Sequence, residues 1–347
     1  MEKLRVGVIG AGMFACFRHI PDLLRTGEVE LTAVCRRNPE ALAKVADHFG
    51  IAGRYTDYQA MLDDAALDAV VVSSPHGLHY EHTRAALERG LPVLSDKPLA
   101  VTSVQAETLR DLAAAKGLAL LVASGPPFNG LHRYFRERIA RSDLGTVHLV
   151  QVTALSNIDS FGFFGHGAFP EGTPYFMPPT AFRASPELGG GGYFQDHGSH
   201  AVAGILLTTG LRPAEVTASF DDPELDMRSS VTIRFDTGAL AVLTHVGNAF
   251  PDTPTLRVFN STLYVGTTGS LSTDSRTGKT LFQAWGQDLE EIPAEALPPN
   301  SSPAENFVGI VRGHEAPLLP VEVAVQMVRV IEAAYRSARE GGTVRLL

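Results

Sequence analysis

Cysteine, tryptophan and long apolar runs are scarce in this chain. Its 347 residues include 2 cysteines, Cys16 and Cys35, and 1 tryptophan. Two cysteines in a chain of this length do not make a disulfide scaffold, so we interpret both as small buried side chains. No apolar run reaches the ~20 residues that cross a bilayer, and the N-terminal sequence enters a strand pattern instead of a signal peptide. We therefore expect a cytoplasmic protein with no membrane partner.

An excess of positive charge is also missing. The 38 Asp and Glu outnumber the 29 Lys and Arg, which gives a formal net charge of -9. This balance argues against nucleic acid as the main partner. With 44% hydrophobic and 19% charged residues, the composition is that of an ordinary folded protein. The length allows two domains with substantial cores.

Two patterns of periodicity divide the chain. Up to residue 123, short apolar runs alternate with helical stretches, which is typical of a parallel, doubly wound sheet. From residue 124 onward, several segments alternate apolar and polar residues, which is typical of antiparallel strands with one face on a core. We therefore predict an α/β protein with domains over residues 1–123 and 124–347. The alternating segments of the second domain lie at residues 146–154, 215–218, 230–235 and 239–246.

A glycine-rich motif follows the first strand pattern, over residues 5–9. It reads Gly10-Ala11-Gly12-Met13-Phe14-Ala15 and opens a helical stretch, in which Pro21 should kink or shorten the helix. In such a motif the first glycine turns sharply, the second lets the backbone approach a pyrophosphate, and the alanine allows close helix–strand packing. An ordinary glycine-rich turn is the alternative. The strand–loop–helix context favours a dinucleotide site, in which we include Gly10, Gly12, Met13, Phe14 and Ala15.

Two arginines follow the second strand pattern, over residues 31–35. Folds that prefer NAD usually place Asp or Glu there to hold the ribose 2′-hydroxyl. In this chain the next residues are Arg36-Arg37-Asn38, which include no carboxylate. Guanidinium groups suit a 2′-phosphate, so we predict NADP as the cofactor, with NAD as the second choice. Alternatively, one or both arginines are solvated turn residues.

The stretch 69–98 leads from a strand, through a turn and a helix, to Asp96-Lys97-Pro98 at the end of another strand. A lysine in this position is a candidate reactive group, and we place Asp96 and Lys97 at the cofactor. We assign Ser74, Pro75 and His79, in the turn after the earlier strand, to the wall around the nicotinamide ribose. Histidines at 76, 79 and 82 do not share one helix face, so we expect no metal site.

A second cluster follows the run Gly189-Gly190-Gly191-Gly192. Asp196 and His200 are four residues apart in the next helical pattern, and that spacing puts both side chains on one helix face. Near the helix start, the helix dipole favours an ionised Asp196. A polar helix face is the alternative.

Residues 156–186 resist regular assignment and are rich in phenylalanine. This composition suggests an aromatic wall or lid over a substrate, and a packed surface loop is the alternative.

Taken in order, these motifs resemble the glucose-fructose oxidoreductase and inositol dehydrogenase family (Gfo/Idh/MocA) over essentially the full chain. The resemblance implies a Rossmann domain followed by an α+β domain with an open-faced, mostly antiparallel sheet. It also implies that Lys97 contacts the reacting hydroxyl, Asp196 holds the substrate, and His200 exchanges the proton, with Lys97 as the alternative base. Asp96 stands where the family has Glu, and Arg183 is a candidate substrate-binding or structural residue.

The resulting hypothesis is an NADP(H)-dependent oxidoreductase that moves hydride between nicotinamide and a carbinol or carbonyl carbon. The resemblance implies a sugar, an inositol or a related polyol as substrate. Two alternatives stay open: a redox-assisted NAD-dependent glycosidase, and a non-catalytic regulator that senses dinucleotide. An open sheet face can pair with a second subunit, so we expect a homodimer or homotetramer formed through it.

Overall fold

The computed structural model describes residues 2–158, 163–164, 180–250 and 257–346. By their internal contacts these residues form two compact units. The first contains the chain up to Ser124 and also Ser301–Val325, whereas the second contains nearly all other described residues. The predicted boundary at residues 123 and 124 had placed residues 301–325 in the second domain.

The first unit is built on a parallel sheet of six described strands in the order β3-β2-β1-β4-β5-β6. This arrangement confirms the predicted doubly wound sheet. Strand β4 has the sequence AVVV and is buried at every position, as a central parallel strand must be. The strands are β1 (Leu4–Ile9), β2 (Val29–Cys35), β3 (Gly53–Tyr55), β4 (Ala69–Val72), β5 (Val93–Asp96) and β6 (Leu120–Ala123).

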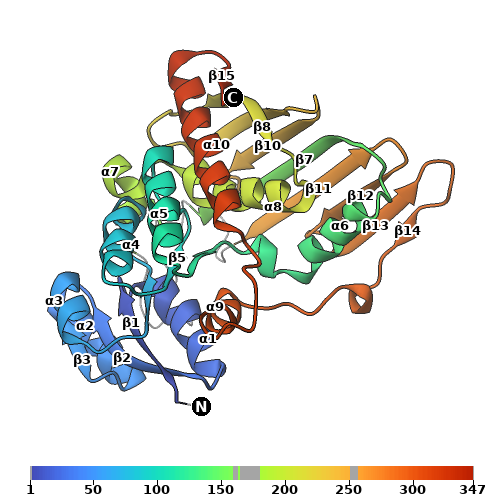
Figure 1. Ribbon diagram of the computed structural model, residues 1–347. Coiled ribbons are helices and arrows are strands. Elements are labelled where there is room, and N and C mark those ends of the chain that lie inside the picture. Colours follow the sequence, from blue (N-terminus) through green and yellow to red (C-terminus); the bar gives the residue numbers. More distant parts are fainter. Residues whose placement is uncertain (1, 159–162, 165–179, 251–256, 347) are drawn as a thin grey trace. The chain divides into compact units, whose positions relative to one another are not determined.

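Helices connect these strands, and side-chain caps define where several of them begin. The Asn38 side chain accepts from the Ala41 N–H at the start of α2, and Thr102 caps α5 in the same way. Helix α9 (Pro303–Val311), far along the chain, packs against α1, β5 and β6 (Figure 1). The other helices are α1 (Ile20–Arg25), α2 (Pro39–Phe49), α3 (Tyr58–Asp64), α4 (His79–Glu88) and α5 (Ser103–Lys116).

The second unit is built on a sheet of nine described strands in the order β14-β13-β12-β11-β7-β10-β9-β8-β15. Its pairs are antiparallel except for β7 with β10, which confirms the mostly antiparallel prediction. The strands are β7 (Val147–Ser156), β8 (Pro213–Phe220), β9 (Arg228–Phe235), β10 (Leu240–Val246), β11 (Val258–Gly266), β12 (Gly269–Asp274), β13 (Lys279–Ala284), β14 (Glu290–Glu291) and β15 (Val344–Arg345).

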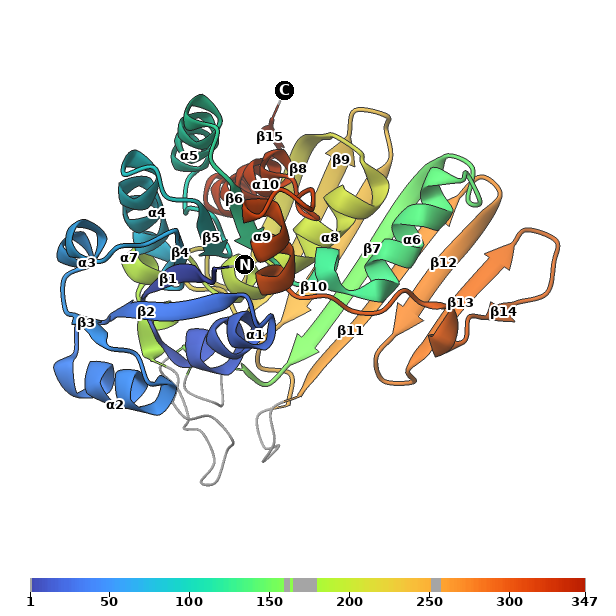
Figure 2. The same ribbon diagram turned by 60° about the horizontal axis from the view of Figure 1, so that its bottom comes forward.

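One face of this sheet carries the core of the second unit. Along β9 the residues Ser229, Val231, Ile233 and Phe235 are buried, and the residues between them are more exposed. Helices α6 (Gly130–Ala140) and α8 (Ser199–Thr209) pack together, and α8 contacts β7 (Figure 2). The other helices are α7 (Pro186–Gly189) and α10 (Val321–Glu340), of which the part from Gln326 onward belongs to this unit.

Candidate active site

The glycine motif turns tightly between β1 and the first helical segment. Gly10 has φ +84, and a Cβ there would lie 2.4 Å from the Ser74 backbone nitrogen, so this position requires glycine. At Gly12 a Cβ would meet no described protein atom closer than 3.9 Å. The packing of the protein therefore does not require glycine at this second position. A ligand that approaches the backbone at Gly12 would require glycine there.

The residues after the loop form a π-helical turn over Ala15–His19, and the α-helix α1 begins at Ile20. Pro21 lies in the first turn of α1, directly after this π-helical turn. The widened turn ahead of it avoids the clash that a proline makes inside an α-helix, which agrees with the expected shortening. Ala15 is fully buried, whereas Phe14 is 41% exposed.

The π-helical turn places His19 against the Asp96-Lys97-Pro98 motif. His19 is buried, and its Nε2 lies 3.4 Å from Asp96 Oδ2. The other carboxylate oxygen, Oδ1, accepts the Lys97 N–H at 2.8 Å, and Ser73 Oγ lies 3.3 Å from Oδ2. Burial alone would raise the pKa of Asp96, but the contact with His19 and the positive charge of Lys97 hold it well below its usual range.

Lys97 is 8% exposed and directly follows β5. Its backbone N–H is fixed by Asp96, and its peptide bond to Pro98 is cis. The contact between His19 and Asp96 therefore joins the turn that follows the dinucleotide loop to the lysine motif.

His79 connects the turn after β4 to the lysine motif. Its ring nitrogens lie 2.7 Å from the Ser74 carbonyl oxygen and 2.6 Å from the Pro98 carbonyl oxygen. The side chain is fully buried, and burial lowers its pKa. The ring therefore braces the two turns from inside the protein, and its predicted contact with the cofactor stays a prediction. Ser74 Oγ is bound by His82 Nδ1 at 2.9 Å, and Pro75 is partly exposed beside it.

Arg36 and Arg37 differ in their surroundings. Arg36 directly follows β2, is half-buried, and donates from Nη1 to the Ala11 carbonyl oxygen at 2.5 Å. Burial lowers the pKa of Arg36, but an arginine stays charged. Arg37 is exposed. The structure therefore places one guanidinium group against the glycine loop, at the position where an acidic residue would serve NAD.

In the second unit, Asp196 is paired with Arg183. The Arg183 Nε lies 3.0 Å from Asp196 Oδ2, and both side chains are largely buried. The guanidinium group also lies over the rings of Phe163 and Phe182, with 5.2 and 4.4 Å to their centroids. Arg183 therefore neutralises and orients the carboxylate that the sequence singled out.

His200 lies in the first turn of α8, which begins at Ser199 directly after a π-helical turn over Phe194–Gly198. The sequence predicted a helix here but not its π-helical start. His200 Nδ1 accepts the Gly125 N–H at 3.3 Å. In the neutral ring this contact places the proton on Nε2.

Three residues near this segment were missed by sequence reasoning. His245 on β10 is fully buried, with its ring centroid 5.6 Å from that of His197, and burial lowers its pKa well below the usual value, so it is neutral. The alternation of Ala241, Leu243 and His245 along the strand was a usable signal that it faces inward. Asp226 and Tyr335, which bind the start of the segment, have no local sequence signal.

Several predictions concern residues that the structure does not describe, or residues that belong to different units. Most of the aromatic stretch 156–186 lies outside the described residues, although Phe163 and Phe164 are described and buried. Lys97 belongs to the first unit, whereas Asp196 and His200 belong to the second. Their predicted meeting around a substrate stays a prediction.

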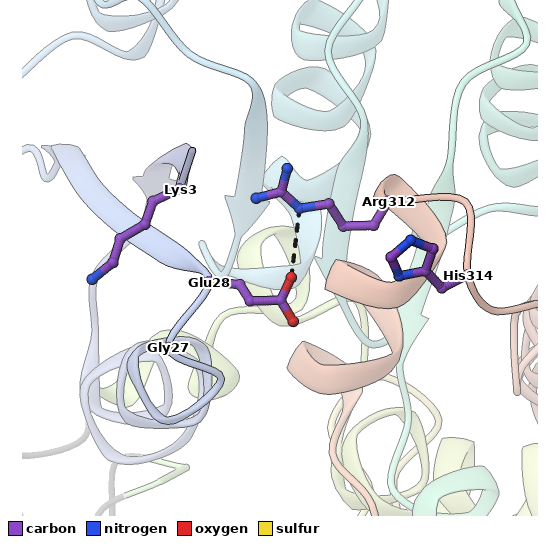
Figure 3. Close-up of a pocket in the computed structure, with 5 residues that line it drawn as sticks. All are labelled: Lys3, Gly27, Glu28, Arg312 and His314. Atoms are coloured by element: carbon purple, nitrogen blue, oxygen red, sulfur yellow. Dashed lines mark ion pairs between the residues drawn. The ribbon is translucent and has the colours of Figure 1, made fainter. Parts of the chain in front are cut away.

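A separate pocket lies in the first unit (Figure 3). Lys3, Gly27, Glu28, Arg312 and His314 line it, and Arg312 Nε lies 3.6 Å from Glu28 Oε2. Lys3 precedes β1, whereas Gly10 follows it. The pocket is therefore at the opposite end of the strand from the dinucleotide loop, and we do not assign it to the active site.

The described part of the chain contains no helix that is both long and apolar enough to cross a membrane. Within the same residues, no group of three or more His, Cys, Asp or Glu side chains has an arrangement that could hold a metal ion.

Two consecutive parts of the chain match models of one protein family. Residues 4–124 match the model described as oxidoreductase family, NAD-binding Rossmann fold (GFO_IDH_MocA). Residues 132–272 match the GFO/IDH/MocA C-terminal domain.

Individual proteins align over nearly the whole chain. A D-xylose 1-dehydrogenase (NADP(+)) from Haloferax volcanii is 30% identical to this chain, and the alignment covers 98% of this chain and 99% of that protein. A scyllo-inositol 2-dehydrogenase (NADP(+)) from Bacillus subtilis is 25% identical, with coverage of 100% and 97%. The crystal structure of an inositol dehydrogenase homolog complexed with NAD+ from Azotobacter vinelandii has the same fold, with a TM-score of 0.82, 21% identity, and coverage of 99% and 97%.

Proposed function

Since the chain belongs to the Gfo/Idh/MocA oxidoreductase family and is an NAD(P)-dependent dehydrogenase or reductase of CH–OH groups, we propose that it prefers NADP(H). We further propose that its substrate is a sugar, an inositol or a related polyol. Two relatives that align over nearly their full length are named for D-xylose and for scyllo-inositol, and both names specify NADP(+). The proposed location is cytoplasmic, and the proposed assembly is a homodimer or homotetramer.

One observation carries the proposal: the contact between the dinucleotide loop and the lysine motif. His19, at the end of the turn that follows the loop, lies 3.4 Å from the carboxylate of Asp96, which in turn fixes the Lys97 N–H. The buried lysine at the end of β5 and the loop after β1 belong to the same unit. A group that acts on a substrate hydroxyl beside a nicotinamide ring needs such a fixed position.

The residues around the loop fit a phosphorylated dinucleotide. Gly12 offers open space next to the backbone, and Arg36 offers a permanent positive charge at the end of β2. When bound, the nicotinamide would accept or supply the hydride. Arg36 would pair with the 2′-phosphate, and Gly12 would allow the pyrophosphate to approach.

The three proposed catalytic residues have separate tasks. Oxidation of a carbinol releases a hydroxyl proton, and reduction of a carbonyl consumes one, so an acid–base group is needed. We assign this task to His200, whose ordinary pKa is near neutral, with Lys97 as the alternative. Lys97 would also hydrogen-bond the reacting oxygen. Asp196, held by Arg183, would accept hydrogen bonds from a substrate hydroxyl.

The proposal is tested by cofactor titration and a substrate screen. Nicotinamide fluorescence would be followed while the protein is titrated with NADPH and NADH. Absorbance at the nicotinamide band would then be recorded with D-xylose, scyllo-inositol, other aldoses and ketosugars. We expect NADPH to bind more tightly than NADH, and at least one polyhydroxylated substrate to be turned over. In Lys97→Met and His200→Asn we expect turnover to fall strongly while NADPH binding is retained. Binding without net redox on any of these compounds would contradict the oxidoreductase proposal.

A further inference from the structure

The segment that carries Asp196 and His200 is held at its start by Tyr335. Helix starts leave several backbone N–H groups without intrahelical partners. Here the N–H groups of Gly192 and Gln195 both donate to Tyr335 Oη, at 2.9 and 3.1 Å. A hydroxyl that accepts two hydrogen bonds has one proton left to donate. In the structure Tyr335 donates it to Asp226 Oδ1.

Asp226 binds the N–H groups of Tyr193 and Phe194, which lie between Gly192 and Gln195. The Tyr193 N–H donates to the Asp226 carbonyl oxygen at 2.6 Å, and the Phe194 N–H donates to Asp226 Oδ2 at 2.9 Å. Four consecutive N–H groups are thus bound by two residues that are 109 positions apart in sequence, three by side-chain oxygens and that of Tyr193 by the Asp226 carbonyl oxygen. We call this arrangement the Asp226–Tyr335 clamp.

The glycines ahead of the helix make room for the clamp. At Gly191, whose φ is +151, a Cβ would lie 2.5 Å from the Tyr335 ring. At Gly192 a Cβ would lie 2.1 Å from the Asp226 carbonyl oxygen. Distances this short exclude any side chain, so these two glycines are required by the clamp and not by loop flexibility.

Both clamp residues are buried, with Asp226 at 0% and Tyr335 at 5% exposure. Tyr335 and the Phe194 N–H donate to different oxygens of the Asp226 carboxyl group, Oδ1 and Oδ2. Burial raises the pKa of Asp226 to about 7, while these two hydrogen bonds oppose the rise and the charge of Asp221 adds to it. A carboxylate at a helix N-terminus is also favoured by the helix dipole.

We propose that Asp226 and Tyr335 are positioning residues that set where the side chains of Asp196 and His200 lie for catalysis. The first intrahelical bond of the segment is from the Asp196 N–H to the Gly192 carbonyl oxygen. Asp196 therefore lies one turn from the clamped residues, and its location follows theirs. This inference rests on the proposed function, because it takes Asp196 and His200 as the residues that act on the substrate.

Two variants test the clamp, and the chain offers a matched control. Tyr335→Phe removes one hydroxyl, and Asp226→Asn replaces one of the two carboxyl oxygens, which accept from Tyr335 and from the Phe194 N–H, with an NH2 donor. The control is Tyr264→Phe, which removes a hydroxyl from another buried tyrosine, 1% exposed, on β11. Amide hydrogen exchange of residues 192–200 would be measured first, because it needs no substrate. Thermal unfolding would confirm that each variant folds.

In Tyr335→Phe we expect the Gly192 and Gln195 amides to exchange about tenfold faster or more, since each loses its acceptor. We expect kcat to fall about 10-fold to 100-fold, as for a misplacement of roughly 1 Å, with little change in NADPH affinity. Tyr264→Phe should leave both exchange and kcat unchanged. A purely structural role would alter the unfolding temperature and the exchange but not kcat.

Unchanged exchange in Tyr335→Phe would overturn the clamp itself. Faster exchange with an unchanged kcat would overturn its positioning role. These failures are distinct from failure of the proposed function, which would appear as undiminished turnover in His200→Asn, or as no turnover by the unmodified protein while exchange still reports the clamp.

Discussion

Replacement of Arg36 by aspartate should reverse the cofactor preference. Arg36 follows β2 and donates to the Ala11 carbonyl oxygen within the glycine loop. The substitution removes the cation that we assign to the 2′-phosphate. It also introduces a carboxylate at the position where NAD-preferring folds bind the ribose 2′-hydroxyl.

The size of the effect can be worked out from the contacts that change. A hydrogen bond to a charged group contributes about 1.5–3 kcal/mol, and every ~1.4 kcal/mol changes an affinity tenfold. Loss of the phosphate contact should therefore weaken NADPH binding about 10-fold to 100-fold. NADH has no 2′-phosphate and loses only the contribution of the Arg36–Ala11 contact to the loop, about 1 kcal/mol, which the new carboxylate can offset.

The assay is the fluorescence titration with NADPH and NADH, at fixed ionic strength because exposed charges are screened by salt. Arg37→Ala is the matched control: it removes the same charge from the neighbouring residue, which is exposed, and it should change the NADPH affinity by less than about 1 kcal/mol. Equal weakening of both cofactors in Arg36→Asp would refute the assignment. A larger effect in Arg37→Ala would move the phosphate contact to Arg37.

Three further predictions concern the remaining site residues. Lys97→Met and His200→Asn should each lower kcat about 10²- to 10⁴-fold in steady-state assays, and retained turnover in either would remove that residue from the mechanism. Arg183→Leu leaves the carboxylate of Asp196 buried without its partner, so urea unfolding should show a loss of about 3–5 kcal/mol, and an unchanged midpoint would contradict the ion pair. Asp226, with a folded pKa of about 7 against 3.8, contributes stability that is complete below pH 3.8 and is lost as the pH rises through 7. The unfolding free energy of the unmodified protein relative to Asp226→Asn should therefore fall by about 2.5 kcal/mol between pH 5 and pH 8, and a flat difference would show that Asp226 titrates normally.

The parts of the fold and site that the sequence predicted are those set by local order. Strand β4 and the turn at Ser74 follow from a short apolar run and the residues after it. The glycine loop was predicted from the spacing of its glycines. The structure gives the reason for the first of them: a Cβ at Gly10 would clash with the backbone at Ser74, in the turn after β4. Parallel strands place their C-terminal ends at one edge of a sheet, so Lys97 could be assigned to the loop's neighbourhood without knowledge of the contact that joins them.

The parts that the sequence did not predict depend on partners far apart along the chain. Asp226 and Tyr335 are 109 residues apart, and neither stands in a motif, since an aspartate in a loop and a tyrosine in a helix have many ordinary roles. The amphipathic pattern of α9 indicates that the helix packs on something. It does not indicate that the partner is the first sheet, whose last strand ends about 180 residues earlier.

The contact between His19 and Asp96 was missed for a different reason: the local geometry was taken to be α-helical. Both segments that carry site residues contain a π-helical turn, over Ala15–His19 and over Phe194–Gly198. Such a turn accommodates one more residue than an α-helical turn, so the residues beyond it are rotated by roughly 100° relative to a continuous α-helix. In the first segment His19, the last residue of the turn, contacts Asp96, and in the second the turn contains Asp196, which contacts Arg183. The α-helical period predicts that these segments are helical but gives the wrong directions for their side chains. Those directions bring His19 to Asp96 and Asp196 to Arg183.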